Sequence, residues 1–275
     1  MQKTSRIVGR EENGTGVAVD QPTRDDAVMQ AVLITGTDTD VGKTGVAVEL
    51  LKLLRDDGCR VGALKPAASG RNAAGRWDDA DALADAAGVP RSELDRVCPF
   101  RYDLPWAPPH AAAGRDQPPP SVRTIDAALA AWRDHCDWLL IEGAGGLLCP
   151  IAVDGDRTLT IADLAERWAV PTVTVVAQRL GMISHSLLTN EVMQARGIAN
   201  RAWVFNNPTP PDDREEEREK LAQSVAEIVS RSPGVAEIVR PFGGDAPLSI
   251  RRKTGGPLGP LTAKEATPWF RPIEK

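Results

Sequence analysis

The sequence predicts an α/β protein whose mostly parallel sheet carries helices on both faces. Two observations predict this fold class. Short apolar segments alternate with amphipathic segments of helical length along most of the chain, and parallel strands need long crossover connections of that kind. Polar residues that could meet a ligand also follow several of the apolar segments at the point where each ends, which is typical of open parallel sheets.

Composition limits the size of the core and the choice of partners. With 275 residues and 42% hydrophobic content, the chain can form either one α/β domain with tails or two small domains. A net charge of −5 gives no reason to expect nucleic acid, and no stretch approaches the roughly 18 apolar residues that cross a membrane. The four scattered cysteines, without an apolar N-terminal run, predict reduced thiols in the cytoplasm.

The first apolar segment leads into a glycine-bounded loop. Residues 32–35 read as a buried strand, 36–42 as the loop, and Lys43-Thr44 as the first turn of a helix. The amides of such a loop face a phosphate, Lys43 reaches the outer phosphates, and the Thr44 hydroxyl ligates Mg²⁺. Five residues separate the two glycines where the general pattern has four, and Thr37 stands where the first glycine is usual. The motif predicts a P-loop NTPase-like domain that binds nucleotide.

The remaining elements follow from periodicity and from glycine and proline stops. The helix after the loop ends at Gly58, and the next strand runs into Pro66, which cannot continue it. Prolines crowd residues 99–120, which predicts a long connection. Strands are expected at 32–35, 60–64, 138–142, 172–176, 202–205 and 236–239, and helices at 45–57, 77–87, 122–136, 160–169, 184–196 and 214–231.

The same signals divide the chain into three parts. Residues 1–30 are polar and lack an apolar period, which predicts a flexible N-terminal tail. Residues 31–245 form a single P-loop α/β domain. Residues 246–275 contain a basic run and a Gly/Pro run, which predict a poorly ordered C-terminal tail.

Three charged or polar side chains stand at the ends of predicted strands. Lys65, Glu142 and Asn206 each follow a different apolar segment. Because the carboxyl ends of parallel strands meet along one edge, these residues and the phosphate loop are expected to share one site. A second lysine beside a phosphate cradle and a metal-linked carboxylate favours an enzyme that moves the γ-phosphoryl group onto a bound acceptor.

Taken together, these motifs give the chain a family resemblance. The segments 36–44, 65–70, 81–83, 109–110, 142–146, 181–185 and 206–211 follow one another in an order and at spacings that resemble dethiobiotin synthetase, the ATP-dependent enzyme of biotin synthesis. The resemblance covers about residues 31–245 and includes the extra residue in the loop. It implies that 7,8-diaminononanoate, CO₂ and MgATP give dethiobiotin, ADP and phosphate, through a carbamate and a carbamic-phosphoric anhydride.

The resemblance also implies a role for each matching residue and a homodimer with substrate at its interface. Lys65 would stand between carbamate and γ-phosphate, and Ser69, Gly181 and Ser184 would hold the substrate, its carboxylate lying at the start of the helix near residue 181 of the partner subunit. The residues implied in catalysis are Lys65, Lys43 and Thr37; those implied in Mg²⁺ binding are Thr44, Asp81 and Glu142. The residues implied in ATP binding are Asp40, Val41, Gly42, Lys43, Thr44, Gly45, Asp81, Glu142, Gly143, Ala144, Gly145, Asn206, Asn207 and Pro241, with Asn206 recognising adenine.

Two departures fall near the expected substrate site. Ser184 stands where relatives usually carry asparagine, and Pro108 is an extra proline before Pro109-His110. Both bear on substrate binding more than on chemistry. The histidines His110 and His185 fit a spacer role as well as a functional one, and the acidic first turn at Asp78–Asp81 also fits compensation of a helix dipole.

Two other classes compete with this interpretation. A partition or positioning ATPase is expected to carry a lysine near the start of its loop, where this chain has Asp38. An amidotransferase synthase that activates a carboxylate would append a glutaminase domain, for which no length remains.

Overall fold

The computed structural model describes residues 28–207, 214–241, 247–251 and 258–273. The predicted tail at residues 1–30 lies almost wholly outside these ranges, and Gln30 already belongs to the first strand. The strands are β1 (Gln30–Gly36), β2 (Val61–Leu64), β3 (Ala68–Ser69), β4 (Arg101–Tyr102), β5 (Trp138–Glu142), β6 (Pro150–Asp154), β7 (Arg157–Thr160), β8 (Thr172–Ala177), β9 (Asn200–Asn206), β10 (Ala236–Arg240), β11 (Ser249–Arg251), β12 (Gly259–Pro260) and β13 (Arg271–Pro272).

The helices connect these strands in the expected alternation. They are α1 (Lys43–Asp56), α2 (Asp78–Ala87), α3 (Leu94–Val97), α4 (Pro108–Ala113), α5 (Val122–Ala130), α6 (Ile161–Arg167), α7 (Met182–Ala195), α8 (Glu215–Ser230) and α9 (Ala263–Ala266), with short 3₁₀ turns at Arg91–Glu93 and Thr267–Trp269. Among the described residues, no helix is long and apolar enough to span a bilayer.

The central sheet is mostly parallel, as the alternation predicts. Its strand order is β12-β11-β10-β9-β8-β1-β5-β2, with β13 paired to β1 off this path. All neighbours from β10 to β2 are parallel, whereas β11, β12 and β13 pair antiparallel. The fold class is confirmed, with antiparallel additions at one edge and beside β1.

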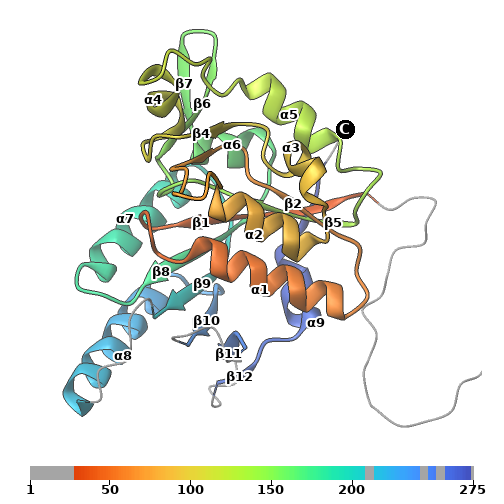
Figure 1. Ribbon diagram of the computed structural model, residues 1–275. Coiled ribbons are helices and arrows are strands. Elements are labelled where there is room, and N and C mark those ends of the chain that lie inside the picture. Colours follow the sequence, from red (N-terminus) through yellow and green to blue (C-terminus); the bar gives the residue numbers. More distant parts are fainter. Residues whose placement is uncertain (1–27, 208–213, 242–246, 252–257, 274–275) are drawn as a thin grey trace, which may run out of the picture.

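Helices cover both faces of this sheet (Figure 1). The chain moves from β1 to β2 in one direction along the sheet and from β8 through β9 to β10 in the other. Because parallel crossovers are right-handed, opposite directions place their helices on opposite faces. Helix α1 therefore covers one face, where α2 packs beside it, while α7 and α8 pack together on the other.

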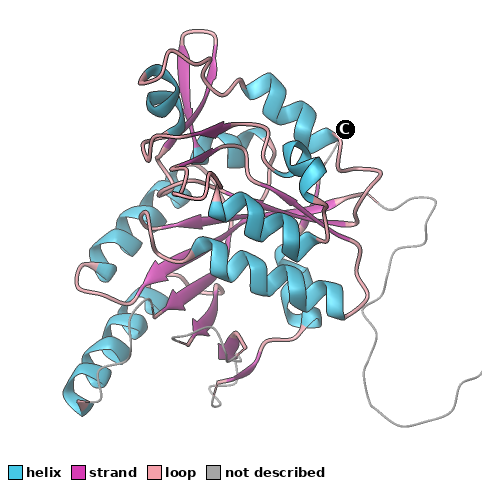
Figure 2. Cartoon of the chain, in the orientation of Figure 1, coloured by secondary structure: helices cyan, strands magenta, loops and turns pink. Residues whose placement is uncertain are grey.

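Two local elements in the middle of the chain were not predicted. The β6–β7 hairpin stands outside the main sheet (Figure 2), and its arms are too short for a clear period-two pattern. Helix α4 begins at Pro108 inside the proline-rich connection, because proline is well tolerated in the first turn of a helix.

The predicted helix 122–136 ends as α5 at Ala130, since Trp132 turns into the core and is only 2% exposed.

The C-terminal segment, for which a poorly ordered tail was predicted, docks on the main sheet in its described part. In the described part of this segment, β13 pairs with the start of β1 through Gln30↔Pro272, and the amide of Ile273 donates to the carbonyl of Met29 at 3.0 Å. Trp269 and Phe270 are each 5% exposed and join the main core. Apolar residues separated by prolines and charges give no periodic signal, so only their contact with β1 shows their role.

This docking predicts a measurable contribution to stability. We expect Phe270→Ala to lower the free energy of unfolding by about 3 kcal/mol, since it removes a buried ring that packs edge-on against Trp138 with centroids 5.1 Å apart. Urea unfolding followed by far-UV circular dichroism measures the change. Trp106→Ala is the matched control, because that ring is 54% exposed; equal effects of the two substitutions would contradict the docking of the segment.

Candidate nucleotide-binding and active site

The phosphate loop joins β1 to α1 in the conformation that the motif predicts. Two of its residues have positive φ: Asp40 at 56° and Gly42 at 93°. At Gly42 a side chain is excluded on two grounds, because a Cβ there would also lie 2.1 Å from Nδ2 of Asn206. The loop is thus shaped by its own glycine and by the end of β9 behind it.

Lys43 lies in the first turn of α1 with its ammonium group folded back onto the loop. Its Nζ donates to the carbonyl of Asp38 at 3.0 Å, and the residue is 7% exposed. Burial lowers the pKa of Lys43, and the nearby positive charge of Lys65 lowers it further. An anion beside both lysines would relieve this repulsion, which is what a triphosphate supplies.

A four-residue polar cluster lies next to Lys43, where α1, α2 and the ends of β2 and β5 meet. The ammonium group of Lys65 forms ion pairs with Glu142 Oε1 at 2.7 Å and with Asp79 Oδ2 at 3.0 Å. The Thr44 hydroxyl lies 2.8 Å from Asp79 Oδ1 and 2.9 Å from Glu142 Oε1. We refer to Thr44, Lys65, Asp79 and Glu142 as the cation cluster. The sequence prediction that Lys65, Glu142 and the loop share one strand-end site is confirmed by these distances.

Burial and mutual attraction control ionisation within the cation cluster. Lys65 and Glu142 are only 2% and 0% exposed. Burial alone would lower the pKa of Lys65, but the carboxylates of Glu142 and Asp79 outweigh it and raise that pKa above its ordinary value. Burial raises the pKa of Glu142, against the pull of Lys65. For Asp79, burial is outweighed by Lys65 and the pKa is lowered. Lys65 is therefore a fixed positive charge at neutral pH.

The acid beside Thr44 is not the one that the family resemblance implied. Asp81, which the family resemblance pointed to, is turned away from the loop and pairs with Arg76 at 3.0 Å and Arg91 at 3.7 Å. Asp79 takes the place beside Thr44. On a helix, two positions correspond to about 200° of rotation, so the two carboxylates point in nearly opposite directions. The docking angle of α2 decides which one faces the loop.

The oxygen atoms of the cation cluster fit a magnesium ion. Glu142 Oε2 is buried and has no hydrogen-bond partner among the described residues, so one lone-pair-bearing atom is left for a ligand. A hydroxyl and two carboxylates are hard oxygen ligands of the kind that Mg²⁺ prefers.

Two adjoining cavities open along this edge. One, of about 530 Å³, is lined by the loop, the cation cluster and Ser69. The other, of about 480 Å³, is lined mainly by apolar side chains of the segment after β5 and of α7, including Leu147, Leu148 and Leu188. Thr39 and Gly145 line both cavities. A polar cavity beside the phosphate loop thus adjoins an apolar one.

Asn206 lies behind the loop at the end of β9. Its Nδ2 donates to the carbonyl of Val41 at 2.8 Å, its Oδ1 accepts from Arg240 at 3.1 Å, and the residue is 2% exposed. The side chain therefore braces the loop, a contact that the strand-end pattern did not predict.

The other candidate residues surround these features. Thr37 lines the apolar cavity, Ala144 and Asp40 line the polar one, and the carbonyl of Gly143 lies 3.4 Å from Lys65 Nζ. Gly181 is the N-cap of α7 with φ 93°, and Ser184 is exposed in its first turn. Gly45 lies against Arg240. Asn207 and Pro241 follow β9 and β10, whose last residues Asn206 and Arg240 are register partners, so the two lie side by side; the rest of the segments 206–211 and 240–243 lies outside the described residues.

Comparison with known proteins identifies the family. A family model described as an AAA domain matches residues 30–238. The ATP-dependent dethiobiotin synthetase BioD of Aromatoleum aromaticum is 40% identical over 211 residues, which are 75% of this chain and 92% of that protein. The chain belongs to the dethiobiotin synthetase family. BioD 1 of Escherichia coli is 35% identical over 189 residues, 67% of this chain and 80% of its own length, and BioD of Anaeromyxobacter dehalogenans is 37% identical over 185 residues with the same two shares.

Membership of the dethiobiotin synthetase family confirms the family resemblance seen in the sequence and the prediction of an ATP-dependent ligase. Among solved structures, the signal recognition particle receptor FtsY of Elizabethkingia anophelis aligns with a TM-score of 0.43 and 15% identity, over 88% of this chain and 64% of that one.

Proposed function

We propose that this chain catalyses ATP-dependent closure of the dethiobiotin ring from 7,8-diaminononanoate and CO₂. One observation carries the proposal: a buried, positively charged lysine, Lys65, lines the same cavity as the phosphate loop and Ser69, and an apolar cavity adjoins it. This arrangement suits an acceptor with a polar reacting end and an aliphatic remainder. It also distinguishes an acceptor-using enzyme from a nucleotide switch, which needs only the phosphate loop and the metal.

The proposed reaction has three balanced steps. One amine of the substrate attacks CO₂ and loses a proton to give a carbamate. A carbamate oxygen attacks the γ-phosphorus while the bond to the leaving ADP oxygen breaks, giving a carbamic-phosphoric anhydride. The second amine then attacks the carbonyl carbon, phosphate leaves, and the amine proton is released as the ring closes.

Lys65 is assigned to the second and third steps. Negative charge builds on the transferred phosphoryl oxygens and on the carbamate during transfer, and a preorganised cation in a site that excludes water stabilises such charge strongly. Its raised pKa keeps Lys65 protonated, so it acts as a charge and not as a base. Lys43, released from the Asp38 carbonyl, would hold the β- and γ-phosphates.

Thr44, Asp79 and Glu142 would hold Mg²⁺, which neutralises charge on the triphosphate when bound. Their oxygen atoms and the unpartnered Oε2 of Glu142 support this assignment. Asn206, Asn207 and Pro241 would form the adenine site, since an asparagine amide can pair with both N6 and N7 of adenine.

The apolar cavity would hold the aliphatic chain of the substrate, and the face around it would form a homodimer interface. Leu148 and Leu188 line that cavity and are 53% and 64% exposed, and Leu180 is fully exposed before α7. Large apolar side chains gathered at one exposed place mark interaction sites. Gly181 and Ser184 begin α7, where helix amides favour an anion such as the carboxylate of a substrate bound to the partner subunit.

The decisive measurement is phosphate release from MgATP with bicarbonate and 7,8-diaminononanoate added singly and together. We expect release only with both, together with one dethiobiotin formed per ATP consumed. An analogue that lacks one of the two amines is the matched control, because it can form a carbamate but has no second amine to close the ring. Phosphate release that needs neither substrate and responds to lipid or DNA would instead indicate a positioning ATPase.

A further inference from the structure

Arg240, at the end of β10, is the centre of a polar chain that reaches the phosphate loop. Its Nε donates to Glu49 Oε1 at 2.5 Å, and its Nη1 donates to Asn206 Oδ1 at 3.1 Å. Asn206 in turn donates to the carbonyl of Val41 at 2.8 Å. Three elements, α1, β10 and β9, are thus connected to one carbonyl of the loop.

This chain of contacts is largely withdrawn from water. The side chains of Arg240 and Glu49 are 18% and 20% exposed, and burial raises the pKa of Glu49 even though Arg240 opposes it. The other carboxylate oxygen, Oε2 of Glu49, is buried without a partner among the described residues. A pair desolvated to this degree contributes little net stability, so its position calls for another explanation.

Room for the guanidinium group is provided by Gly45. A Cβ at this position would lie 2.9 Å from both Cζ and Nη2 of Arg240. The absent side chain lets Arg240 lie against the first turn of α1, one residue after Thr44. The guanidinium group therefore lies between the first turn of α1 and the end of β9 that carries Asn206.

The partners of Asn206 determine how its amide is oriented. Arginine can only donate and a backbone carbonyl can only accept, so Oδ1 faces Arg240 and Nδ2 faces Val41. An amide has two lone pairs on oxygen and two N–H groups, so one of each remains for a ligand. Adenine presents an N6 donor and an N7 acceptor, which match this pair, whereas guanine presents two acceptors.

We propose that Arg240, held by Glu49, is a positioning residue that selects adenine by fixing the orientation of the Asn206 amide against the phosphate loop. This inference rests on the proposed role of Asn206 in reading the base. Without Arg240 only the Val41 carbonyl orients the amide, and the discrimination between a 6-amino and a 6-oxo purine weakens.

The test compares Arg240→Leu with the parent enzyme using ATP and GTP as alternative phosphoryl donors. We expect the ratio of kcat/KM for ATP to that for GTP to fall about tenfold, the discrimination of one bidentate base contact. The change should appear mainly as a higher KM for ATP, while kcat with ATP stays close to the parent. Glu49→Gln keeps an acceptor for Arg240 but removes the charge. The ATP/GTP ratio of this variant should therefore lie between those of the parent enzyme and Arg240→Leu.

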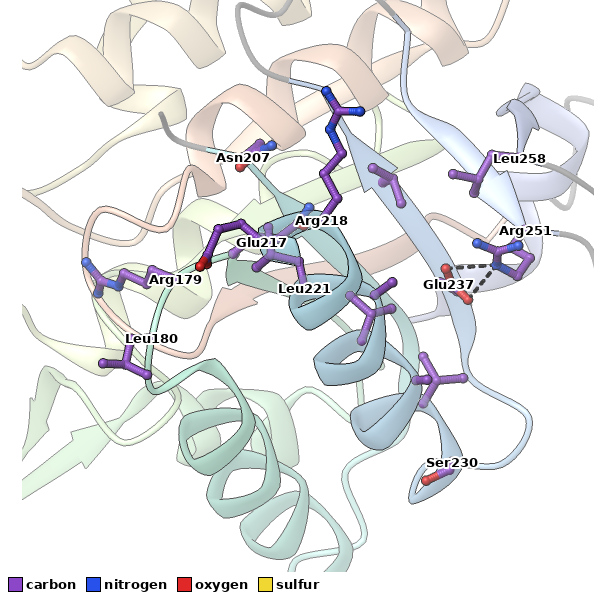
Figure 3. A pocket seen from close by; sticks show the side chains of 16 residues that line it. Arg179, Leu180, Asn207, Glu217, Arg218, Leu221, Ser230, Glu237, Arg251 and Leu258 are labelled. Carbon is purple, nitrogen blue, oxygen red and sulfur yellow. Dashed lines mark hydrogen bonds and ion pairs between the residues drawn. The ribbon is translucent and has the colours of Figure 1, made fainter. Parts of the chain in front are cut away.

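A matched control is available on the next strand. Arg251 in β11 pairs through Nε with Glu237 at 3.0 Å, in the wall of a cavity of about 1170 Å³ between α8, β10 and β11 (Figure 3). This pair has the same chemistry but no contact with Asn206. Arg251→Leu should leave the ATP/GTP ratio unchanged.

Asn206→Ala separates failure of this inference from failure of the proposed base contact. If Asn206→Ala leaves the ratio unchanged, the base is read elsewhere and both ideas are wrong. If Asn206→Ala strongly lowers the ATP/GTP ratio but neither Arg240→Leu nor Glu49→Gln changes it in folded protein, only the positioning role of Arg240 is overturned. In the Asn206→Ala background Arg240→Leu should have no further effect on the ratio; a full additional loss would show that Arg240 acts independently.

Discussion

Lys65→Met is expected to reduce dethiobiotin formation by about 10³-fold or more while nucleotide still binds. The substitution keeps the length of the side chain but removes the charge that faces the transferred phosphoryl group, and loss of one preorganised stabilising group costs 10²–10³-fold or more in related chemistry. Lys43 and the loop amides remain, so the affinity for ATP should stay close to that of the parent. Product formation and equilibrium binding of a fluorescent nucleotide measure the two quantities separately.

Folding must be monitored in the same variant. Lys65 is bonded to Glu142 and Asp79, and removing the cation leaves two carboxylates facing each other, at a cost of about 3 kcal/mol. Lys52→Met, an exposed position on α1, controls for the loss of a lysine. Methylammonium added to a folded Lys65→Met protein should restore part of the activity by supplying the missing cation. Full activity in Lys65→Met would contradict the role assigned to Lys65.

Asp79→Asn and Asp81→Asn are expected to differ sharply although the residues are two positions apart. Asp79 lies 2.8 Å from the Thr44 hydroxyl, so its amide variant should need about 10–100-fold more Mg²⁺ for half-maximal activity. Asp81 pairs with Arg76 and Arg91 away from the loop, so Asp81→Asn should keep the parental Mg²⁺ dependence and lose about 1 kcal/mol of stability.

Titration of activity with Mg²⁺ at fixed ATP measures the first effect, and urea unfolding measures the second. Each variant is the control for the other, because both remove one carboxylate charge from the same helix. The reverse result, with the Mg²⁺ requirement raised by Asp81→Asn and unchanged by Asp79→Asn, would restore Asp81 as the metal ligand and reject the orientation of α2.

Much of the fold follows from local signals. Apolar segments bounded by Gly58, Gly88 and Gly197 mark the strand and helix alternation, and the loop between Gly36 and Gly42 marks the nucleotide site. These features depend on backbone geometry within a few residues, which a sequence displays directly. Because the carboxyl ends of parallel strands meet along one edge of a sheet, Lys65, Glu142 and the loop are expected to lie together without any knowledge of packing.

Other parts of the site depend on how elements dock. Whether Asp79 or Asp81 faces Thr44 is a question of rotation about the axis of α2, and both residues satisfy the same helix-start pattern. Arg240 and Glu49 meet across 191 positions of sequence, and neither carries a motif. Phe270 and Ile273 are buried against the edge of β1 although their surroundings resemble a linker.

The family, the phosphate loop and the strand-end residues were therefore readable from the order of the amino acids, because periodicity and short motifs report local conformation. Three features could be seen only in the folded chain: which carboxylate faces Thr44, how Arg240 contacts Asn206, and where the C-terminal segment docks. Each is a contact between side chains that become neighbours only after helices and strands have packed, and their orientation is set by that packing.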